Sequence, residues 1–441
     1  MAKEKVLAYL DQNEEGLMDF LKETIRINSV NPGKDIPAPK EEEIAKYLAG
    51  YLEKEGFKVD MFAVDPEGKR LNVCAVLPGS KKSKDSKNLI LSAHTDTVIV
   101  SEIEKWTVDP FGAEEKDGKI YGRGSNDMKG GMAAAVFAAK AIKDCGVETD
   151  GDVILMFSAG EESCEGGEIG TKACVDRGYR APLALVCEPT SLELHNSTCS
   201  TFAFELIVHG KAIHTCCRNQ VMFPQSAYQG SGEEIGVDAV EKALPFIQLF
   251  YRLEKEWNFR YKGKSAVGTG GKGGHDNQGI GVFTINPSFI ESGTYIGAVP
   301  GKVKVTYAVW HPPEVSNEDV IKEIRQKVSA LAQTDDWLIA NPPEVIGPVP
   351  QVWPGFVTDE TIAPVVQFKK SYESAMSAPP IGSGFRATCD GTYLINEGIP
   401  AIICGPGDIG DGVHGYDEFV RREEVLKAAK IYASFIYDWC G

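Results

Sequence analysis

Two apolar runs followed by polar side chains stand out in the chain: NLILSAHTD at residues 88–96 and DVILMFSAGEE at residues 152–162. Runs of this length and composition favour β-strands, and a helical pattern at about 128–145 lies between them. A strand, a helix and a second strand in this order are typical of a parallel sheet with crossover helices. This region therefore predicts an α/β fold.

The same alternation continues on both sides of this region. Further elements are expected at the following residues: helices at 40–55, 167–178, 361–375 and 421–437, and strands at 58–64, 71–77, 183–187 and 401–404. We therefore predict a catalytic domain of the α/β class, with a mostly parallel sheet and helices on both faces. Residues 1–196 form its first part and residues 356–441 its second.

The pattern changes between residues 197 and 355. The order here is strand, helix, two strands, helix and strand, at 201–209, 238–256, 281–286, 302–310, 317–332 and 344–349. This order predicts an inserted α+β sandwich. Its Gly-rich segment at 268–281 lacks the phosphate-binding loop pattern, so a lid loop or a linker is expected.

Composition excludes several classes of partner. The 441 residues carry 46 Lys and Arg against 63 Asp and Glu, a formal net charge of −17, and 43% of them are apolar. An acidic chain repels nucleic acid and anionic lipid, so neither nucleic acid nor a membrane is expected as a partner. The N-terminus shows no apolar signal segment, which favours a cytoplasmic protein.

The cysteines do not suggest a disulfide framework. There are 11 of them, no Cys-x-x-Cys motif occurs, and Cys216 and Cys217 are adjacent. Most are expected to be buried thiols that pack as small apolar residues.

Acidic and imidazole side chains follow four predicted strands and begin one predicted helix. They are His94 and Asp96, Asp127, Glu161 and Glu162, Glu188, and His414. Taken alone, each motif has an ordinary alternative, such as a strand-end hydrogen bond, a helix N-cap or a solvated loop. Together they bring two imidazoles and several carboxylates to the edge where open α/β sheets bind ligands.

The chemistry of these side chains indicates a metal centre. Nitrogen and oxygen ligands without thiolate suit zinc, cobalt or manganese, and one carboxylate can bridge two ions about 3.5–4 Å apart. We therefore predict two divalent metal ions. Residues two apart on a strand point to the same side, so Asp96 is expected to hold the His94 ring in its metal-binding tautomer.

With these motifs in this order, the chain resembles the zinc aminoacylase, acetylornithine deacetylase, succinyl-diaminopimelate desuccinylase and glutamate carboxypeptidase family of co-catalytic metallohydrolases. The N-terminal segment from Asp19 to Pro32 is also similar to this family. The resemblance implies the following metal ligands: Asp127 for both ions, His94 and Glu188 for one, and Glu162 and His414 for the other. It further implies that Glu161 is the general base, that Asp96 orients a ligand, and that the Asp127-Met128 peptide is cis.

The inserted domain also carries a motif at residues 209–215 that resembles the lid motif of the family. The resemblance therefore implies that residues 197–355 form a lid and dimerisation domain. By resemblance, His214 reaches the active site of a neighbouring subunit and stabilises the oxyanion, which implies a homodimer. Two features depart from the family. Trp310 stands where relatives commonly carry an arginine before the Pro312-Pro313 turn, and the Gly-rich insertion at 268–281 is unusual.

The predicted reaction is hydrolysis of an amide bond by metal-activated water. The expected substrate is a small N-acyl amino acid, with a deacetylase or desuccinylase as the nearest type, because Glu188 rather than aspartate favours the deacylases. A dipeptidase or carboxypeptidase acting on a short peptide is the alternative. A non-catalytic metal-dependent binding protein is less favoured, because Glu161 would have no task there. Arg386 is a candidate partner for a substrate carboxylate, with a surface arginine as the alternative.

Overall fold

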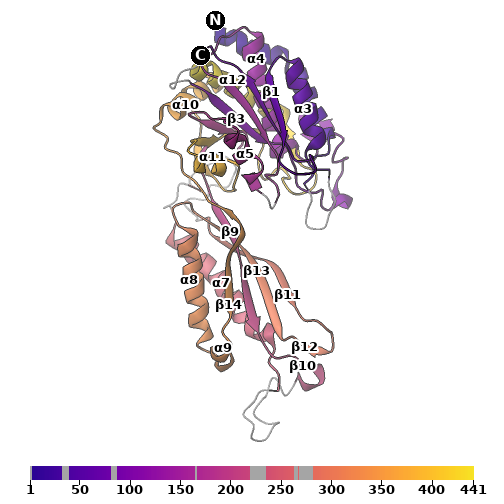
Figure 1. The fold of residues 1–441 in the computed structure, drawn as a ribbon, viewed down its shortest axis with the longest axis vertical. Coiled ribbons are helices and arrows are strands. Elements are labelled where there is room, and N and C mark those ends of the chain that lie inside the picture. The colour runs from indigo at the N-terminus through magenta and orange to yellow at the C-terminus, as the bar shows by residue number, and fades with distance from the viewer. Residues whose placement is uncertain are drawn as a thin grey trace. The chain divides into compact units, whose positions relative to one another are not determined.

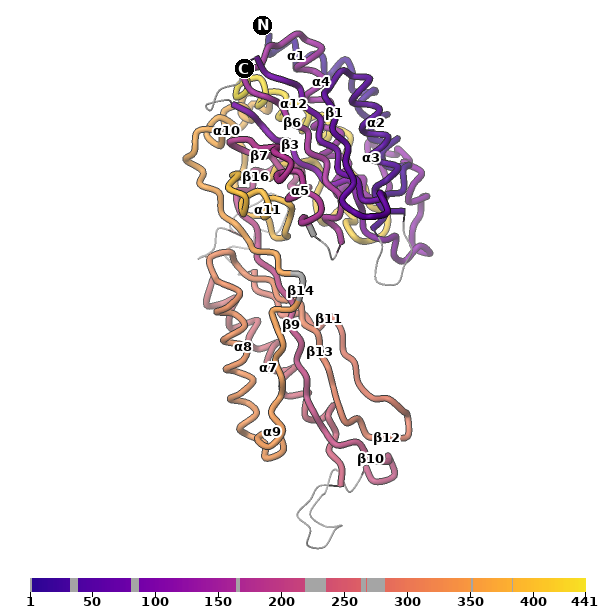
Figure 2. The backbone as a smooth tube through the Cα atoms, viewed as in Figure 1, coloured from indigo at the N-terminus to yellow at the C-terminus, as the bar shows by residue number. Residues whose placement is uncertain are grey.

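The computed structural model describes residues 2–31, 39–80, 87–163, 166–218, 235–262, 267 and 282–441. The chain forms two compact units, one made of Met1–Thr198 with Phe356–Gly441 and the other spanning Cys199–Gly268 and Asn277–Gly355. The indigo N-terminal and yellow C-terminal parts of the chain both belong to the first unit (Figure 2). The middle of the sequence makes up the second, so one unit interrupts the other along the chain.

An eight-stranded sheet organises the first unit, with the strand order β1-β2-β6-β3-β7-β16-β8-β15. The strands are β1 (Lys58–Ala63), β2 (Leu71–Leu77), β3 (Leu89–His94), β6 (Val153–Ser158), β7 (Ala184–Val186), β8 (Leu194–Thr198), β15 (Gly382–Phe385) and β16 (Ala401–Ile403). A separate three-stranded sheet contains β4 (Glu115–Lys116), β5 (Lys119–Tyr121) and β17 (Phe419–Arg421).

The centre of the large sheet is parallel. Strand β3 pairs in parallel with β6 and β7, and β7 pairs in parallel with β16, whereas β1, β2 and β6 are joined by antiparallel pairing. Strands β3, β6, β7 and β16 are buried along their whole length, as their continuous apolar runs predict. The predicted α/β class with a mostly parallel sheet is confirmed. Strands β8 and β15 were not predicted, because short polar and Gly-containing runs carry no strand signal.

Helices cover both faces of this sheet (Figure 1). They are α1 (Ala2–Gln12), α2 (Glu14–Arg26), α3 (Glu42–Lys54), α4 (Gly130–Asp144), α5 (Thr171–Asp176), α10 (Ala363–Met376), α11 (Gly391–Asn396) and α12 (Arg422–Cys440). Helices α4 and α12 pack against one another and against β3, and α5 packs with α11. Short 3-10 turns occur at η1 (Ile103–Lys105) and η3 (Gly166–Glu168). Helices α1, α2 and α11 were not predicted.

The second unit is a four-stranded antiparallel sheet with helices. Its elements are β9 (Ser200–His209), α7 (Ala239–Arg260), β11 (Thr284–Ser292), β13 (Lys302–His311), α8 (Asn317–Ala332), α9 (Asp336–Ala340) and β14 (Glu344–Trp353). The sheet order is β11-β13-β9-β14, and a separate pair joins β10 (Ile213–His214) to β12 (Ala298–Val299). Alternate residues of β13, such as Val305, Tyr307 and Val309, enter an apolar core with α7 and α8. The predicted order of strands and helices matches β9, α7, β11, β13, α8 and β14, whereas α9, β10 and β12 were not predicted.

Among the described residues, no helix combines the length and the apolar character needed to cross a membrane. Seven of the described cysteines are buried and none is in a disulfide, as the sequence predicts for most of them. The Gly-rich segment at 268–281 lies outside the described residues.

Candidate metal centre

The candidate site residues converge at the carboxyl edge of the parallel strands. His94 is the last residue of β3, Glu161 and Glu162 follow β6, Glu188 follows β7, and His414 lies in the loop after β16. Because β6, β3, β7 and β16 are neighbours and run in parallel, their carboxyl ends meet at one edge of the sheet. These residues form two sets of possible metal ligands, and within each set the ligand atoms lie within 4.8 Å of one another. The first set is His94, Asp127 and Glu188, and the second is Asp127, Glu162 and His414.

His94 is buried and faces two carboxylates. Its Nε2 lies 3.0 Å from Oδ1 of Asp127 and 3.9 Å from Oε1 of Glu188. Its Nδ1 lies 2.9 Å from the backbone carbonyl of Asp96, a contact that favours the proton on Nδ1 and leaves Nε2 available for a metal. Burial lowers the pKa of His94, but the neighbouring Asp127, Glu188 and Glu161 outweigh it and raise this pKa well above its ordinary value.

The second set is more open. Nε2 of His414 lies 3.1 Å from Oε1 of Glu162 and 3.7 Å from Oδ2 of Asp127, and the His414 side chain is 55% exposed. The hydrogen bond with Glu162 raises the pKa of His414 to about 9 in the metal-free protein. Asp127 belongs to both sets, as expected for a carboxylate between two ions.

The turn that carries Asp127 is held by a buried glutamate far along the chain. This turn, η2 (Ser125–Lys129), precedes α4, and its Asp127-Met128 peptide is cis, as expected. The Glu418 carboxylate accepts hydrogen bonds from the backbone N–H groups of Gly124, Asn126 and Asp127 at 3.0–3.1 Å. Asp127 is therefore not a helix N-cap, and its carboxylate is directed at the two histidines.

Arg123 connects this turn to the His414 loop. Its guanidinium pairs with Glu418 and donates to the backbone carbonyl of Gly415 at 2.6 Å, and both charged side chains are almost wholly buried. Neither residue was predicted as part of the site. In the sequence, each is a charged residue beside a Gly-rich turn, at Gly122–Gly124 and Gly412–Gly415. A charged residue in such a position is ordinarily expected to be exposed to solvent.

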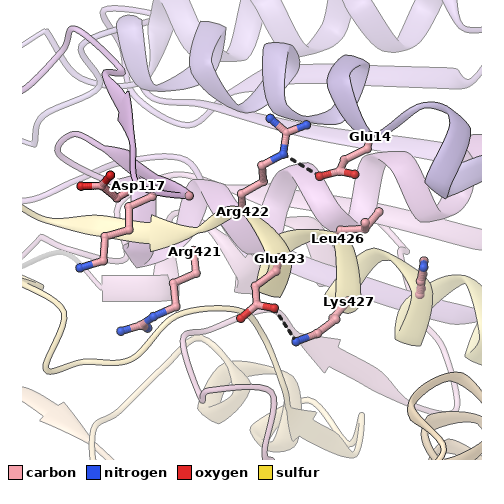
Figure 3. A pocket seen from close by; sticks show the side chains of 10 residues that line it. Glu14, Asp117, Arg421, Arg422, Glu423, Leu426 and Lys427 are labelled. Atoms are coloured by element: carbon pink, nitrogen blue, oxygen red, sulfur yellow. Dashed lines mark hydrogen bonds and ion pairs between the residues drawn. The ribbon is translucent and has the colours of Figure 1, made fainter.

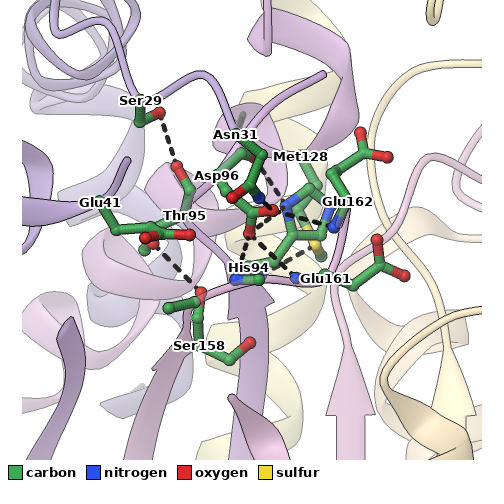
Figure 4. A network of polar contacts seen from close by, with 12 residues as sticks. Ser29, Asn31, Glu41, His94, Thr95, Asp96, Met128, Ser158, Glu161 and Glu162 are labelled. Atoms are coloured by element: carbon green, nitrogen blue, oxygen red, sulfur yellow. Dashed lines mark hydrogen bonds and ion pairs between the residues drawn. The ribbon is translucent and has the colours of Figure 1, made fainter. Parts of the chain in front are cut away.

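The Asp96 side chain does not make the predicted hydrogen bond with the His94 ring. Its carboxylate lies 3.8 Å from Nδ1 of His94, whereas its backbone carbonyl makes the close contact. The carboxylate instead accepts hydrogen bonds from the backbone N–H groups of Gly160, Glu161 and Glu162 at 2.9–3.2 Å (Figure 4). Asp96 therefore anchors the loop that carries two of the candidate acidic residues.

The N-terminal segment that resembles the family completes this anchor. The Asn31 amide donates to the Asp96 carboxylate, and the Ser29 hydroxyl donates to the Thr95 carbonyl at 2.7 Å (Figure 4). A buried ion pair between Glu41 and Arg70, with Nε and Oε2 2.7 Å apart, lies nearby. Burial and the Asp96 carboxylate raise the pKa of Glu41 to about 7.

Glu161 is held beside the two sets of ligands. Burial raises its pKa well above the ordinary value, and Glu162, Glu188 and Asp390 add to this shift while His94 opposes it. Asp390, another buried carboxylate that was not predicted, accepts hydrogen bonds from Ser158 at 2.6 Å and Thr171 at 2.7 Å. A carboxylate with a raised pKa is suited to proton transfer near neutral pH.

The remaining predicted residues lie outside these two sets. Arg386 directly follows β15 and is half-buried. His214 is exposed on β10 of the second unit, where its Nδ1 accepts a hydrogen bond of 3.1 Å from the backbone N–H of Cys216. This bond places the proton of a neutral His214 ring on Nε2. Trp310 lies on β13, half-buried, on the face opposite Val309.

A surface hollow near the start of α12 contains five basic side chains (Figure 3). Carboxylates pair with several of them: Arg422 with Glu14 at 2.6 Å, and Lys427 with Glu423 at 3.0 Å. The hollow therefore resembles a surface ion-pair network more than an anion site.

Comparison with known proteins shows the family of the chain. Residues 90–347 match the model of peptidase family M20/M25/M40. The N-formyl-4-amino-5-aminomethyl-2-methylpyrimidine deformylase of Halalkalibacterium halodurans is 31% identical over 99% of this chain and 97% of its own length. A probable succinyl-diaminopimelate desuccinylase of Staphylococcus aureus is 27% identical over 65% of this chain and 66% of its own.

A solved structure shares the fold. Human carnosine dipeptidase 1 superposes with a TM-score of 0.71 at 16% identity, covering 100% of this chain and 99% of that one. The family match over more than half of the chain and the full-length relative identify the protein: it belongs to peptidase family M20/M25/M40 and is a hydrolase of C–N bonds.

Proposed function

We propose that the protein hydrolyses the amide bond of a small N-acyl compound, using two divalent metal ions held by the five residues of the two ligand sets. The observation that carries this proposal is the shared position of Asp127 between His94 with Glu188 and Glu162 with His414. The donor set fits the metals, because imidazole and carboxylate ligands without thiolate suit zinc, with cobalt or manganese as alternatives. Several buried carboxylates so close together also require positive charge to offset their repulsion.

Each protein group has a defined task in this reaction. When bound, the two ions would lower the pKa of a water to about 7 and polarise the amide carbonyl. Glu161 accepts the proton of the attacking water and gives it to the leaving amine. Asp96 holds Glu161 and Glu162 in position through their backbone N–H groups. His214 presents Nε2–H, the donor that an oxyanion requires.

An N-formyl amine on a small heteroaromatic ring is the first substrate candidate. The full-length deformylase relative supports it, with 31% identity over 99% of this chain.

A small N-acyl amino acid is the second candidate. The desuccinylase relative, similar over 65% of this chain, favours it. Arg386 would then be the residue to pair with the substrate carboxylate.

Initial rates on three substrate types test the proposal. The metal-loaded protein is assayed with the N-formyl pyrimidine amine, with N-acetyl and N-succinyl amino acids, and with unblocked dipeptides. We expect turnover of the first, and preferential turnover of dipeptides would contradict the N-acyl proposal.

Glu161→Gln tests the general base. We expect kcat to fall by about 10²–10⁴-fold while the bound metal is unchanged, because the amide cannot accept the proton. Glu168→Gln, on an exposed residue of η3, is the matched control. Full activity of Glu161→Gln with normal metal content would show that another group is the base.

We also propose a homodimer formed through the second unit. Strand β11 is at the edge of its sheet, and Phe289, Ile290, Tyr295 and Ile296 on and beside it are all more than half exposed. An apolar edge strand is a template for pairing with a second copy.

In sedimentation equilibrium we expect Ile290→Lys to give a monomer. Ile339→Lys, at an exposed position of α9, should stay dimeric. A monomeric, fully active wild type would contradict this proposal.

A further inference from the structure

Cys216 and Cys217 differ from the other described cysteines. Cys216 is exposed and Cys217 half-exposed, whereas seven of the other eight described cysteines are buried and Cys145 is half-exposed. Their sulfur atoms lie 3.7 Å apart, so a thiol reagent can reach two adjacent thiols at once. They also lie two and three residues after His214.

The short turn that carries both thiols is held at its two ends. It is the 3-10 turn η4 (Thr215–Cys217), which begins where β10 pairs with β12 and where the Thr215 N–H donates to the Gly297 carbonyl at 3.0 Å. At the other end, the Arg218 N–H donates to the Thr215 carbonyl, and the Arg218 side chain pairs with Asp238. A change inside this turn therefore has to be absorbed by the residues between Thr215 and Arg218.

We propose that Cys216 and Cys217 are a redox modification site: they close into a reversible disulfide by exchange with a small-molecule disulfide, and closure disturbs His214. The formation of the disulfide is independent of the proposed function, whereas its effect on activity rests on the proposed role of His214.

The exchange uses a disulfide of the glutathione type as the oxidant. One cysteine thiolate attacks the small disulfide, whose S–S bond breaks and releases one thiol, leaving a mixed disulfide on the protein. The second thiolate attacks the protein sulfur of that mixed disulfide and releases the second thiol. The protein loses two protons and two electrons, and the oxidant is reduced to two thiols.

The geometry favours a disulfide that is easily reduced again. Consecutive Cα atoms are about 3.8 Å apart across a trans peptide, below the roughly 4.4–6.8 Å usual for disulfides, so closure strains the turn. Strained and exposed disulfides are the reducible, regulatory ones. The hydrogen bond between the two thiols raises the pKa of Cys217.

Closure acts on His214 through the backbone. The Cys216 N–H that donates to Nδ1 of His214 belongs to the residue that has to rotate when the ring forms. Without this bond, neither the orientation of the imidazole nor its Nε2–H tautomer is fixed. We therefore expect the oxidised protein to lose oxyanion stabilisation.

The test uses the full-length, metal-loaded protein equilibrated with reduced and oxidised glutathione. Free thiols are then blocked with iodoacetamide and the protein is digested with trypsin. Cleavage after Lys211 and Arg218 releases a peptide of residues 212–218 that contains His214 and both cysteines. We expect this peptide to be lighter by two hydrogen atoms and unalkylated after oxidation, and doubly alkylated after reduction with dithiothreitol.

Activity is measured on the same samples. We expect oxidation to lower kcat by about tenfold to a hundredfold, because a misplaced oxyanion donor loses most of its effect, and dithiothreitol to restore it. Cys217→Ser should lose this response, and Cys145→Ser, the matched control, should retain it.

A mixed glutathione adduct as the only product would overturn the redox site. A quantitative disulfide with unchanged kcat would overturn its effect on His214. A protein that forms the disulfide but hydrolyses no amide even when reduced would instead contradict the proposed function.

Discussion

At the scale of single residues, the site depends on backbone groups as much as on side chains. His94 is oriented by the carbonyl of Asp96, and the Asp96 carboxylate is occupied by three N–H groups of the loop after β6. One residue thus positions a histidine and two glutamates at once. This arrangement explains why an imidazole and a carboxylate two residues apart occur at the end of a buried strand.

The pKa of His414 leads to a prediction about metal binding. Since this pKa is about 9 in the metal-free protein, the ring is protonated at neutral pH and has to lose its proton when it binds a metal. Metal affinity should therefore rise with pH up to about 9. The stabilisation that His414 gives the metal-free fold has the opposite trend: it is complete below pH 6.5 and is lost as the pH rises through about 9.

Isothermal titration calorimetry with zinc in two buffers of different ionisation enthalpy measures the protons released. We expect His414→Gln to release fewer protons than the wild type at a pH of about 7.5. His209→Gln, on a half-buried histidine of β9 outside both ligand sets, should release as many protons as the wild type. Equal proton release by all three proteins would mean that His414 is not a ligand.

At the scale of elements, the turn before α4 depends on a carboxylate 291 residues away. Glu418 is buried, accepts three backbone N–H groups of this turn and pairs with Arg123. We expect Glu418→Gln to lower the free energy of unfolding by about 3–5 kcal/mol, because it leaves the buried Arg123 charge without its carboxylate partner. Urea denaturation measures this change. Glu423→Gln, at an exposed position in the first turn of α12, should change it by less than about 0.5 kcal/mol, and equal effects would contradict the role of Glu418.

The packing of α4 against the loop after β7 gives a second prediction at this scale. A Cβ added at Gly131 would lie 2.0 Å from the Cys187 carbonyl oxygen, next to Glu188, whereas one added at Gly50 in α3 meets nothing within 4 Å. We expect Gly131→Ala to destabilise the protein by about 1–3 kcal/mol. Gly50→Ala should stabilise it by about 0.5–1 kcal/mol, because Gly is the poorer helix residue. Equal urea midpoints for the two variants would show that α4 does not pack this closely.

At the scale of the whole molecule, two separate apolar cores support the two compact units. All proposed metal ligands belong to the unit that contains the eight-stranded sheet. Each unit can therefore unfold cooperatively by itself, and a bound metal stabilises only the unit that contains the ligands.

This division predicts two calorimetric transitions. Zinc at 100 times its Kd should stabilise the unit with the eight-stranded sheet by about 2.7 kcal/mol and shift only its transition. Leu253→Ala, in the core of the second unit, should shift only the other, by about 2–5 kcal/mol. A single transition that responds to both changes would show that the two units unfold together.

Local sequence patterns were enough to predict the α/β class, the order of the longer apolar strands and of most helices in both units, and the motifs that provide the candidate ligands. These are local properties: apolar runs and their periodicity predict strands and helices, and the residue that ends a buried strand is visible beside it. The run at 88–96 thus predicted β3 with His94 at its end.

The remaining features depend on contacts between residues that are distant in the sequence, so they are visible in the tertiary structure alone. The strand order, β8 and β15, the anchoring of the Glu161 loop by Asp96, and the support of Asp127 by Glu418 and Arg123 have no local pattern. The reason is physical, because a buried charge far along the chain looks like a solvated one until the fold removes water from it and gives it a partner.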